Sequence, residues 1–236
     1  MKSILDHKKT KDLYEILPNY LFRNNVDVVW RSTNWGEPPL HIKNYQNKEF
    51  LKQKCKTENC NYDEILLTDL KQQIETSKKN KILIVLHTST SHGPTYSKKY
   101  PSQFEIFKPV CNSVELANCS QTELINAYDN TIVYTDYILS KVIEDLKDLS
   151  EYKSTMIFVS DHGESLGEKN LYMHGLPMSI APKEQYEIPF IVWTSENSNK
   201  QLKPNKTLSQ HHVFHSVLNF LSIESPIYNE EMNIFK

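Results

Sequence analysis

Apolar residues along the chain form short unbroken runs that predict β-strands. The runs at 26–30, 82–86, 155–160 and 188–194 are rich in β-branched and aromatic side chains, which suit a pleated sheet. The run at 82–86 is apolar throughout. Such a run is typical of a strand that is covered on both faces, as in a parallel sheet.

Between these runs, apolar residues recur at the spacing of an amphipathic helix. Pro18 weakens the first of these predictions, because it removes a backbone donor from the pattern. Ser120 and Glu123 form a capping-box pattern at the start of the longest helix. Strands that alternate with helices predict an α/β domain with a mostly parallel central sheet and helices on both faces. The predicted helices cover 11–22, 62–76, 121–149 and 211–221.

The composition narrows the class of protein. The 236 residues carry a formal net charge of −2 and are 39% hydrophobic, which is enough apolar content for a packed core. A near-neutral chain lacks the basic excess of general nucleic-acid binders. No apolar run approaches the ~18 residues of a membrane span, and the first residues form no apolar signal core. We therefore expect one domain over 1–236, no nucleic-acid partner, and neither anchor nor export signal in the given sequence.

The four cysteines occur in two neighbourhoods, at Cys55 and Cys60 and at Cys111 and Cys119. This arrangement indicates disulfides or a zinc site with four cysteine ligands. Disulfides are favoured because only the first neighbourhood has the tight spacing of a structural zinc site. Four reduced cysteines are the remaining alternative. Disulfides need an oxidising compartment, which conflicts with the missing export signal unless a segment precedes Met1.

Polar clusters follow three of the predicted strands, at 31–34, 87–94 and 160–167. Ligands of open α/β sheets bind outside the carboxyl ends of the strands, so these clusters should share one rim. Asp161 and His162 are the sharpest feature, because carboxylate oxygen and imidazole nitrogen both suit zinc. The alternative for this pair is a solvated turn without metal.

Other histidines offer weaker candidates. His92 and His174 each precede a glycine and are candidates for a second metal or for proton transfer; the alternative is a structural or surface role. His211 and His215 share a helix face, with His212 beside them. A metal cluster is one interpretation of these three, but a partly buried helix face is favoured.

Three ordered segments are the most specific: 158–168 (FVSDHGESLGE), 172–177 (YMHGLP) and 181–185 (APKEQ). They resemble the phosphoethanolamine transferases that modify lipid A, including those that confer colistin resistance. The resemblance covers nearly all of the chain. Further matching segments are 29–31, 91–96, 100–101, 104, 107–111 and 124–130.

The resemblance implies an alkaline-phosphatase/sulfatase-type α/β fold at the periplasmic face of the bacterial inner membrane. It implies transfer of phosphoethanolamine from phosphatidylethanolamine to lipid A or another surface acceptor, through a zinc-bound phosphothreonine. Asp161 and His162 would bind the catalytic zinc, and Asn34 would contact substrate. His92 and His174 would hold the substrate head group or a second zinc, or protonate the leaving group. The family disulfides correspond to Cys55–Cys60 and Cys111–Cys119.

The chain also departs from this family. The family's membrane domain, its strand-borne glutamate ligand and its threonine nucleophile have no counterpart in the sequence, and 209–215 departs from the usual Ser-His-Asp opening. Two protein ligands fall short of the roughly three that a catalytic zinc needs. We therefore expect the C-terminal portion of a transferase catalytic domain that is inactive alone. The alternatives are a related sulfatase or phosphatase, and a non-catalytic module that binds zinc or a lipid head group.

Overall fold

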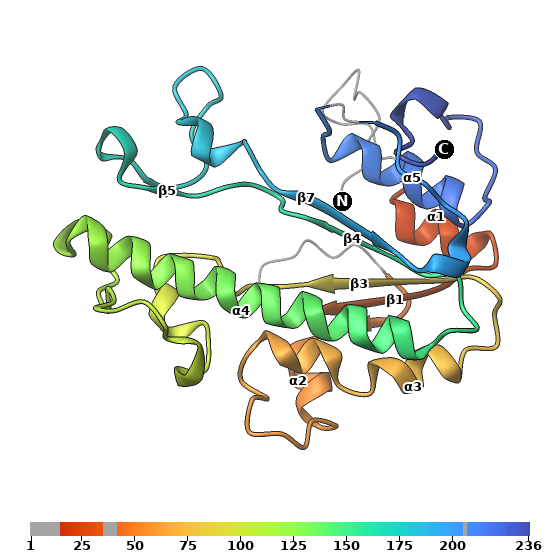
Figure 1. Cartoon of the computed structure of the whole chain (residues 1–236), viewed down its shortest axis with the longest axis horizontal. Helices are drawn as coiled ribbons and strands as arrows, with labels where there is room; N and C mark the ends of the chain where they lie inside the picture. The colour runs from red at the N-terminus through yellow and green to blue at the C-terminus, as the bar shows by residue number, and fades with distance from the viewer. Residues whose placement is uncertain (1–14, 35–41, 205–206) are drawn as a thin grey trace.

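The centre of the fold is a three-stranded parallel sheet (Figure 1). Strand β1 (Asp27–Ser32) lies between β2 (Tyr45–Gln46) and β3 (Ile82–His87), and both neighbours run parallel to it. β1 and β3 pair over their whole length, so they end at the same edge of the sheet. The predicted parallel sheet is confirmed for these strands. The structure, a computed structural model, describes residues 15–34, 42–204 and 207–236.

A second pair of strands lies beside β3 and is antiparallel. β4 (Thr155–Val159) pairs with β7 (Phe190–Thr194) in opposite directions. The predicted strand at 188–194 is present and antiparallel, within a sheet that was predicted to be mostly parallel. A parallel return needs a long crossover, usually a helix. The connection from β4 to β7 instead contains the short hairpin of β5 (Ser165–Leu166) and β6 (Tyr172–Met173).

Helices cover both faces of the sheet, as predicted (Figure 1). α1 (Leu17–Arg23) and α5 (His211–Phe220) share an apolar cluster with Leu83 of β3. α4 (Gln121–Asp148) packs on the opposite face, against Ile84, the next residue along β3. The remaining helices are α2 (Lys48–Lys52), α3 (Leu70–Glu75) and the 3₁₀ helices η1 (Asp63–Leu67), η2 (Tyr96–Lys98), η3 (Ser102–Phe104), η4 (Leu116–Asn118), η5 (Glu168–Asn170), η6 (Lys183–Gln185), η7 (Glu196–Ser198) and η8 (Glu230–Met232).

Two predicted helices have different boundaries. Pro18 lies in the first turn of α1, where a missing backbone donor costs nothing, so it begins the helix instead of interrupting it. Residues 11–14 of that prediction lie outside the described part. The predicted helix over 62–76 is two helices, η1 and α3. Asp69 separates them because its φ of 51° lies in the left-handed region.

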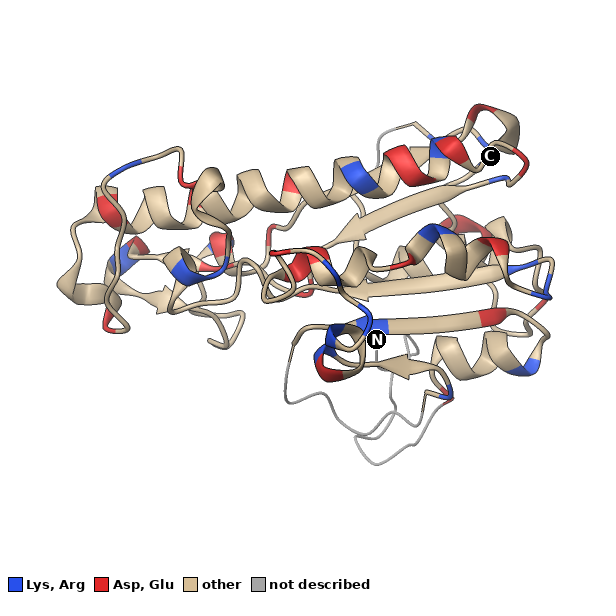
Figure 2. Cartoon of the chain, turned by 90° about the horizontal axis from the view of Figure 1, so that it is seen from below, with Lys and Arg blue, Asp and Glu red and all other residues tan. Residues whose placement is uncertain are grey.

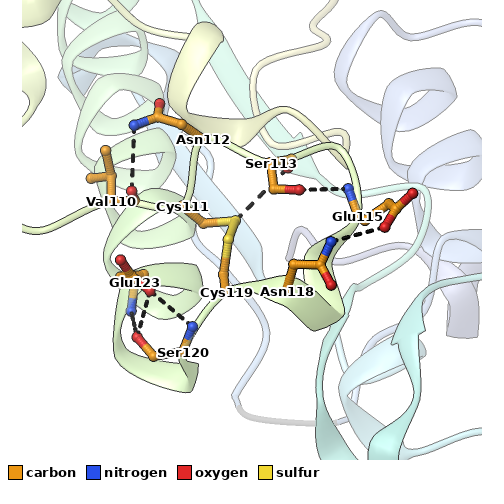
Figure 3. The surroundings of a disulfide bond; sticks show 9 residues. All are labelled: Val110, Cys111, Asn112, Ser113, Glu115, Asn118, Cys119, Ser120 and Glu123. Carbon is orange, nitrogen blue, oxygen red and sulfur yellow. Dashed lines mark hydrogen bonds between the residues drawn. A yellow bond between two sulfur atoms is a disulfide. The ribbon is translucent and has the colours of Figure 1, made fainter.

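The long helix α4 begins as the sequence predicts. Ser120 Oγ accepts a hydrogen bond from Glu123 N at 3.3 Å, and Glu123 Oε2 accepts one from Ser120 N at 2.8 Å (Figure 3). Acidic residues are spread along α4, whereas its two basic residues, Lys141 and Lys147, lie in its C-terminal part (Figure 2). Its inner side spans the parallel sheet and the β4–β7 pair, because Val142 shares one apolar cluster with Ile84 and Met156.

Both predicted disulfides are present. Cys55 is bonded to Cys60, and Cys111 to Cys119. The second bond closes the loop immediately before α4 (Figure 3) and buries Cys111 in an apolar cluster. The four-cysteine zinc site and the four reduced thiols are therefore both excluded.

Strand β3 is less buried than its sequence predicts. Every residue of β3 is half-buried, whereas β1 is buried along nearly its whole length. In the described part of the chain β3 pairs only with β1, and β4 pairs only with β7, so each of these two strands has one edge without a strand partner. None of the described helices is long and apolar enough to cross a membrane.

Candidate metal centre

Three predicted site histidines come together beyond the carboxyl ends of the strands. His92 follows β3, His162 follows β4, and His174 follows β6. The ring centroids of His162 and His174 are 3.6 Å apart, and that of His92 lies 5.5 Å from His174 and 6.4 Å from His162. The rule that ligands bind beyond the carboxyl ends of the strands therefore identified residues that lie close together in the structure.

All three imidazoles use the same ring nitrogen for a local hydrogen bond. His92 and His162 each donate from Nδ1 to the carbonyl of the following glycine, at 2.8 and 2.9 Å. His174 donates from Nδ1 to Glu164 Oε1 at 2.7 Å. Because these oxygens accept, Nδ1 carries the proton and Nε2 of a neutral ring keeps its lone pair. Such contacts orient metal-binding histidines and raise their basicity.

Glu164 is a central residue that the sequence analysis did not single out. Its side chain is 4% exposed, and its second oxygen accepts a hydrogen bond from Tyr96 Oη at 2.9 Å. Burial, followed by the Glu164 charge, raises the pKa of Tyr96, so this phenol stays a donor. The signal that could have found Glu164 is its place in the same loop as Asp161 and His162.

The side chains fit a zinc ion. One ligand atom from each of His162, Glu164 and His174 lies within 4.8 Å of the other two, and this is the one such group in the described residues. Two nitrogens and a carboxylate oxygen are a donor set that zinc accepts in catalytic sites. Asp161, predicted as a ligand, is outside this group and its side chain is 74% exposed. Its Oδ2 nevertheless lies 3.8 Å from His162 Nε2, on the side of the ring that keeps a lone pair.

The backbone of the loop after β4 is held closely by neighbouring segments. Gly163 N donates to Gln185 O at 3.0 Å, and a Cβ at Gly163 would lie 1.9 Å from Glu184 O. On the other side, Gln210 Nε2 donates to the carbonyls of Ser160 and Asp161 at 2.8 and 2.6 Å. The loop is thus fixed in large part through its main chain.

Asn34, the predicted substrate contact, follows β1. Its Nδ2 lies 3.5 Å from His87 Nε2, at the end of β3. The structure therefore brings Asn34 to the same rim as His92, on the strand next to it.

The C-terminal histidines form part of a packed helix. His215 is buried in α5, and its Nδ1 accepts a hydrogen bond from Asn229 N at 3.1 Å. His212 Nδ1 accepts one from Ser209 N at 3.0 Å. These bonds support the favoured interpretation of a partly buried helix face.

Comparisons with known proteins place this site in a family. The sulfatase family model matches residues 14–223. The chain belongs to the sulfatase family. Within it, the chain groups with the phosphoethanolamine transferases, and the predicted alkaline-phosphatase/sulfatase-like fold is confirmed.

Two solved domains and one curated relative illustrate the likeness. The C-terminal periplasmic domain of phosphoethanolamine transferase EptC from Campylobacter jejuni is 35% identical, with a TM-score of 0.83 over 98% of this chain and 74% of that one. The soluble domain of lipooligosaccharide phosphoethanolamine transferase A from Neisseria meningitidis is 30% identical, with a TM-score of 0.86 over 99% and 75%. Phosphoethanolamine transferase EptA of Helicobacter pylori is 42% identical over 100% of this chain and 47% of its own length. The chain thus spans about half the length of the curated relatives it matches.

Proposed function

We propose that this chain provides catalytic-domain residues for the transfer of phosphoethanolamine from phosphatidylethanolamine to lipid A or another surface acceptor. The reaction would take place at the periplasmic face of the inner membrane. The observation that carries the proposal is the cluster of His92, His162 and His174 beside the buried Glu164, in a chain 42% identical to EptA. The name of the Neisseria meningitidis relative specifies lipooligosaccharide, which supports an acceptor of that class.

Zinc is the metal that this donor set favours. His162, Glu164 and His174 would hold it, with Asp161 beside His162. A bound zinc would act as a Lewis acid that polarises a phosphoryl oxygen. Glu164 Oε1 also accepts a hydrogen bond from His174 Nδ1, which orients that ring.

His92 and Asn34 would contact the substrate. The Nδ1–H bond of His92 to Gly93 leaves its Nε2 as an acceptor. That atom accepts a hydrogen bond from the ammonium of the head group, or takes the proton of the acceptor hydroxyl and returns it to the leaving alkoxide. The amide of Asn34 would donate to a phosphate oxygen. No residue of this chain is assigned as the nucleophile, and inactivity of the chain alone stays a prediction.

The proposal is tested with the purified chain, zinc, a labelled phosphatidylethanolamine and lipid A. We expect zinc to raise the melting temperature, and His174→Ala to abolish this shift while His211→Ala, on the exposed start of α5, retains it. Labelled phosphoethanolamine on lipid A would establish transfer and refute the expected inactivity. Release of free phosphoethanolamine would establish a hydrolase instead. Zinc binding without either product would leave a binding module, unless transfer appears when the chain is assayed within a longer protein.

A further inference from the structure

A buried carboxylate outside the metal centre joins the loops that follow β1 and β3. Asp63, at the start of η1, is 3% exposed. Its Oδ1 accepts hydrogen bonds from the hydroxyls of Thr33 and Ser89, and its Oδ2 accepts from Ser89 N at 2.7 Å and from the Thr90 hydroxyl. Thr33 belongs to the loop after β1, whereas Ser89 and Thr90 belong to the loop after β3.

These loops carry the two candidate substrate contacts. Asn34 directly follows Thr33 in the chain. His92 N donates to Ser89 O at 3.2 Å, so the turn that presents His92 starts from a residue that Asp63 holds. The same carboxylate therefore sets the positions of Asn34 and His92 relative to each other.

The helix η1, which begins with Asp63, is held in place by further hydrogen bonds. The guanidinium of Arg31, buried in β1, donates to the carbonyls of Leu66 and Thr68 at 2.7 Å each, at the far end of η1. Glu64 N donates to Tyr134 Oη at 3.1 Å. In the described residues no Lys or Arg forms an ion pair with Asp63, so its charge rests on the loop donors alone. Burying a carboxylate is expensive unless it is fully hydrogen-bonded, which makes these four bonds mutually dependent.

We infer that Asp63 is a positioning residue that aligns Asn34 and His92 on one phosphoethanolamine head group, separately from the metal centre. The inference rests on the proposed function for the identity of this ligand. The metal-binding side chains come from the loop after β4 and from β6, and none of the four bonds to Asp63 involves those segments. Substitution of Asp63 should therefore weaken head-group binding and leave zinc binding unchanged.

The test compares Asp63→Ala, Asp63→Asn and the control Asp27→Ala in the whole chain. Calorimetry measures affinity for phosphoethanolamine and for zinc, and ¹H–¹⁵N spectra follow the side chains of His92 and Asn34. We expect Asp63→Ala to weaken phosphoethanolamine binding about tenfold or more with zinc affinity unchanged. Asp63→Asn should recover most of the affinity, because its oxygen still accepts from Ser89 N while the hydroxyls rotate to accept from its amide.

Asp27→Ala removes one carboxylate–hydroxyl hydrogen bond, from Ser77 Oγ, at the opposite end of β1, so it should leave both affinities and both side-chain signals unchanged. Equal losses of zinc and phosphoethanolamine affinity in Asp63→Ala would overturn the inference, as would unchanged phosphoethanolamine binding. If Asp63→Ala does not fold, Thr33→Val and Thr90→Val each remove one hydroxyl. The first should shift the Asn34 signal and the second that of His92, and unshifted signals would overturn the inference.

The proposed function can fail separately. If the unaltered chain binds no phosphoethanolamine, the assignment of the head group fails. The spectra still decide the positioning role, because Asp63→Ala then shifts the signals of His92 and Asn34 or leaves them in place.

Discussion

The two halves of the candidate site are held in different ways. On the substrate half, the loops that carry Asn34 and His92 are tied by side-chain hydrogen bonds to Asp63. On the metal half, the loop after β4 is held through its main chain, by Gly163 N against Gln185 O. One half thus depends on hydroxyls and a carboxylate, and the other on close approach of two backbones.

This difference determines how each half tolerates substitution. A side-chain network loses its bonds one at a time, so single substitutions there should have graded effects. A close backbone contact has no such graded response, because a single added atom forces a whole segment to move. Because the backbone holds the metal half in place, the ligand side chains form only the hydrogen bonds that orient them.

The largest effect should come from Gly163→Ala. Its Cβ would meet the Glu184 carbonyl oxygen at 1.9 Å, so either the loop or η6 must move. We expect a loss of about 3 kcal/mol or more in the free energy of unfolding, measured by chemical denaturation, together with loss of zinc binding. Gly175→Ala is the matched control, because open space surrounds it and only its φ of +99° is unfavourable. That control should cost about 1 kcal/mol, and equal losses in the two variants would contradict the backbone-contact argument.

The second-largest effect is expected from substitution of the buried carboxylate Glu164. Glu164→Gln keeps the size of the side chain but removes its charge, so it should lower zinc affinity about 10- to 100-fold in calorimetry. Tyr96→Phe keeps the carboxylate and removes only its phenol donor, so its effect should be smaller. Unchanged zinc affinity in Glu164→Gln would exclude Glu164 from the metal centre.

A smaller effect is expected from Gln210, which bonds the metal-side loop from α5. Gln210→Ala removes two hydrogen bonds to main-chain carbonyls and should cost about 1 kcal/mol of stability, read from the urea midpoint. Gln201→Ala is the control, because Gln201 contributes its backbone carbonyl to Lys236 N. A Gln210 variant as stable as this control would show that the loop needs no support from α5.

The elements with strong periodicity were predictable from the sequence, and those set by tertiary contacts were not. α4 begins where its capping box predicts, because that signal is local. The break at Asp69 depends on a left-handed backbone that no pattern in 62–76 indicates. The antiparallel return of β7 follows from the β5–β6 hairpin, whose strands are too short to show alternation.

The same distinction applies to the site. His92 and His162 were predictable because each lies in the loop that follows an apolar strand. Glu164 was missed because its role depends on His174, which the hairpin brings back to it. Asp63 was missed because its partners lie 26 to 30 residues away along the chain, on both sides of it.

The smallest expected effect is a pH dependence that reaches the metal half through α5. Burial, followed by the charges of His212 and His211, lowers the pKa of His215 below its ordinary value of 6.5. The unfolded chain therefore protonates His215 more readily than the folded chain does. The stability that neutral His215 contributes is present above about pH 6.5 and is lost as the pH falls toward the lowered pKa of the folded chain. His215→Asn keeps an acceptor for Asn229 N but does not titrate. Between about pH 7.5 and pH 5.5, the melting temperature of this variant should fall less than that of the unaltered chain. Equal falls in melting temperature would mean that His215 does not make the stability of α5, and of the loop that Gln210 bonds, depend on pH.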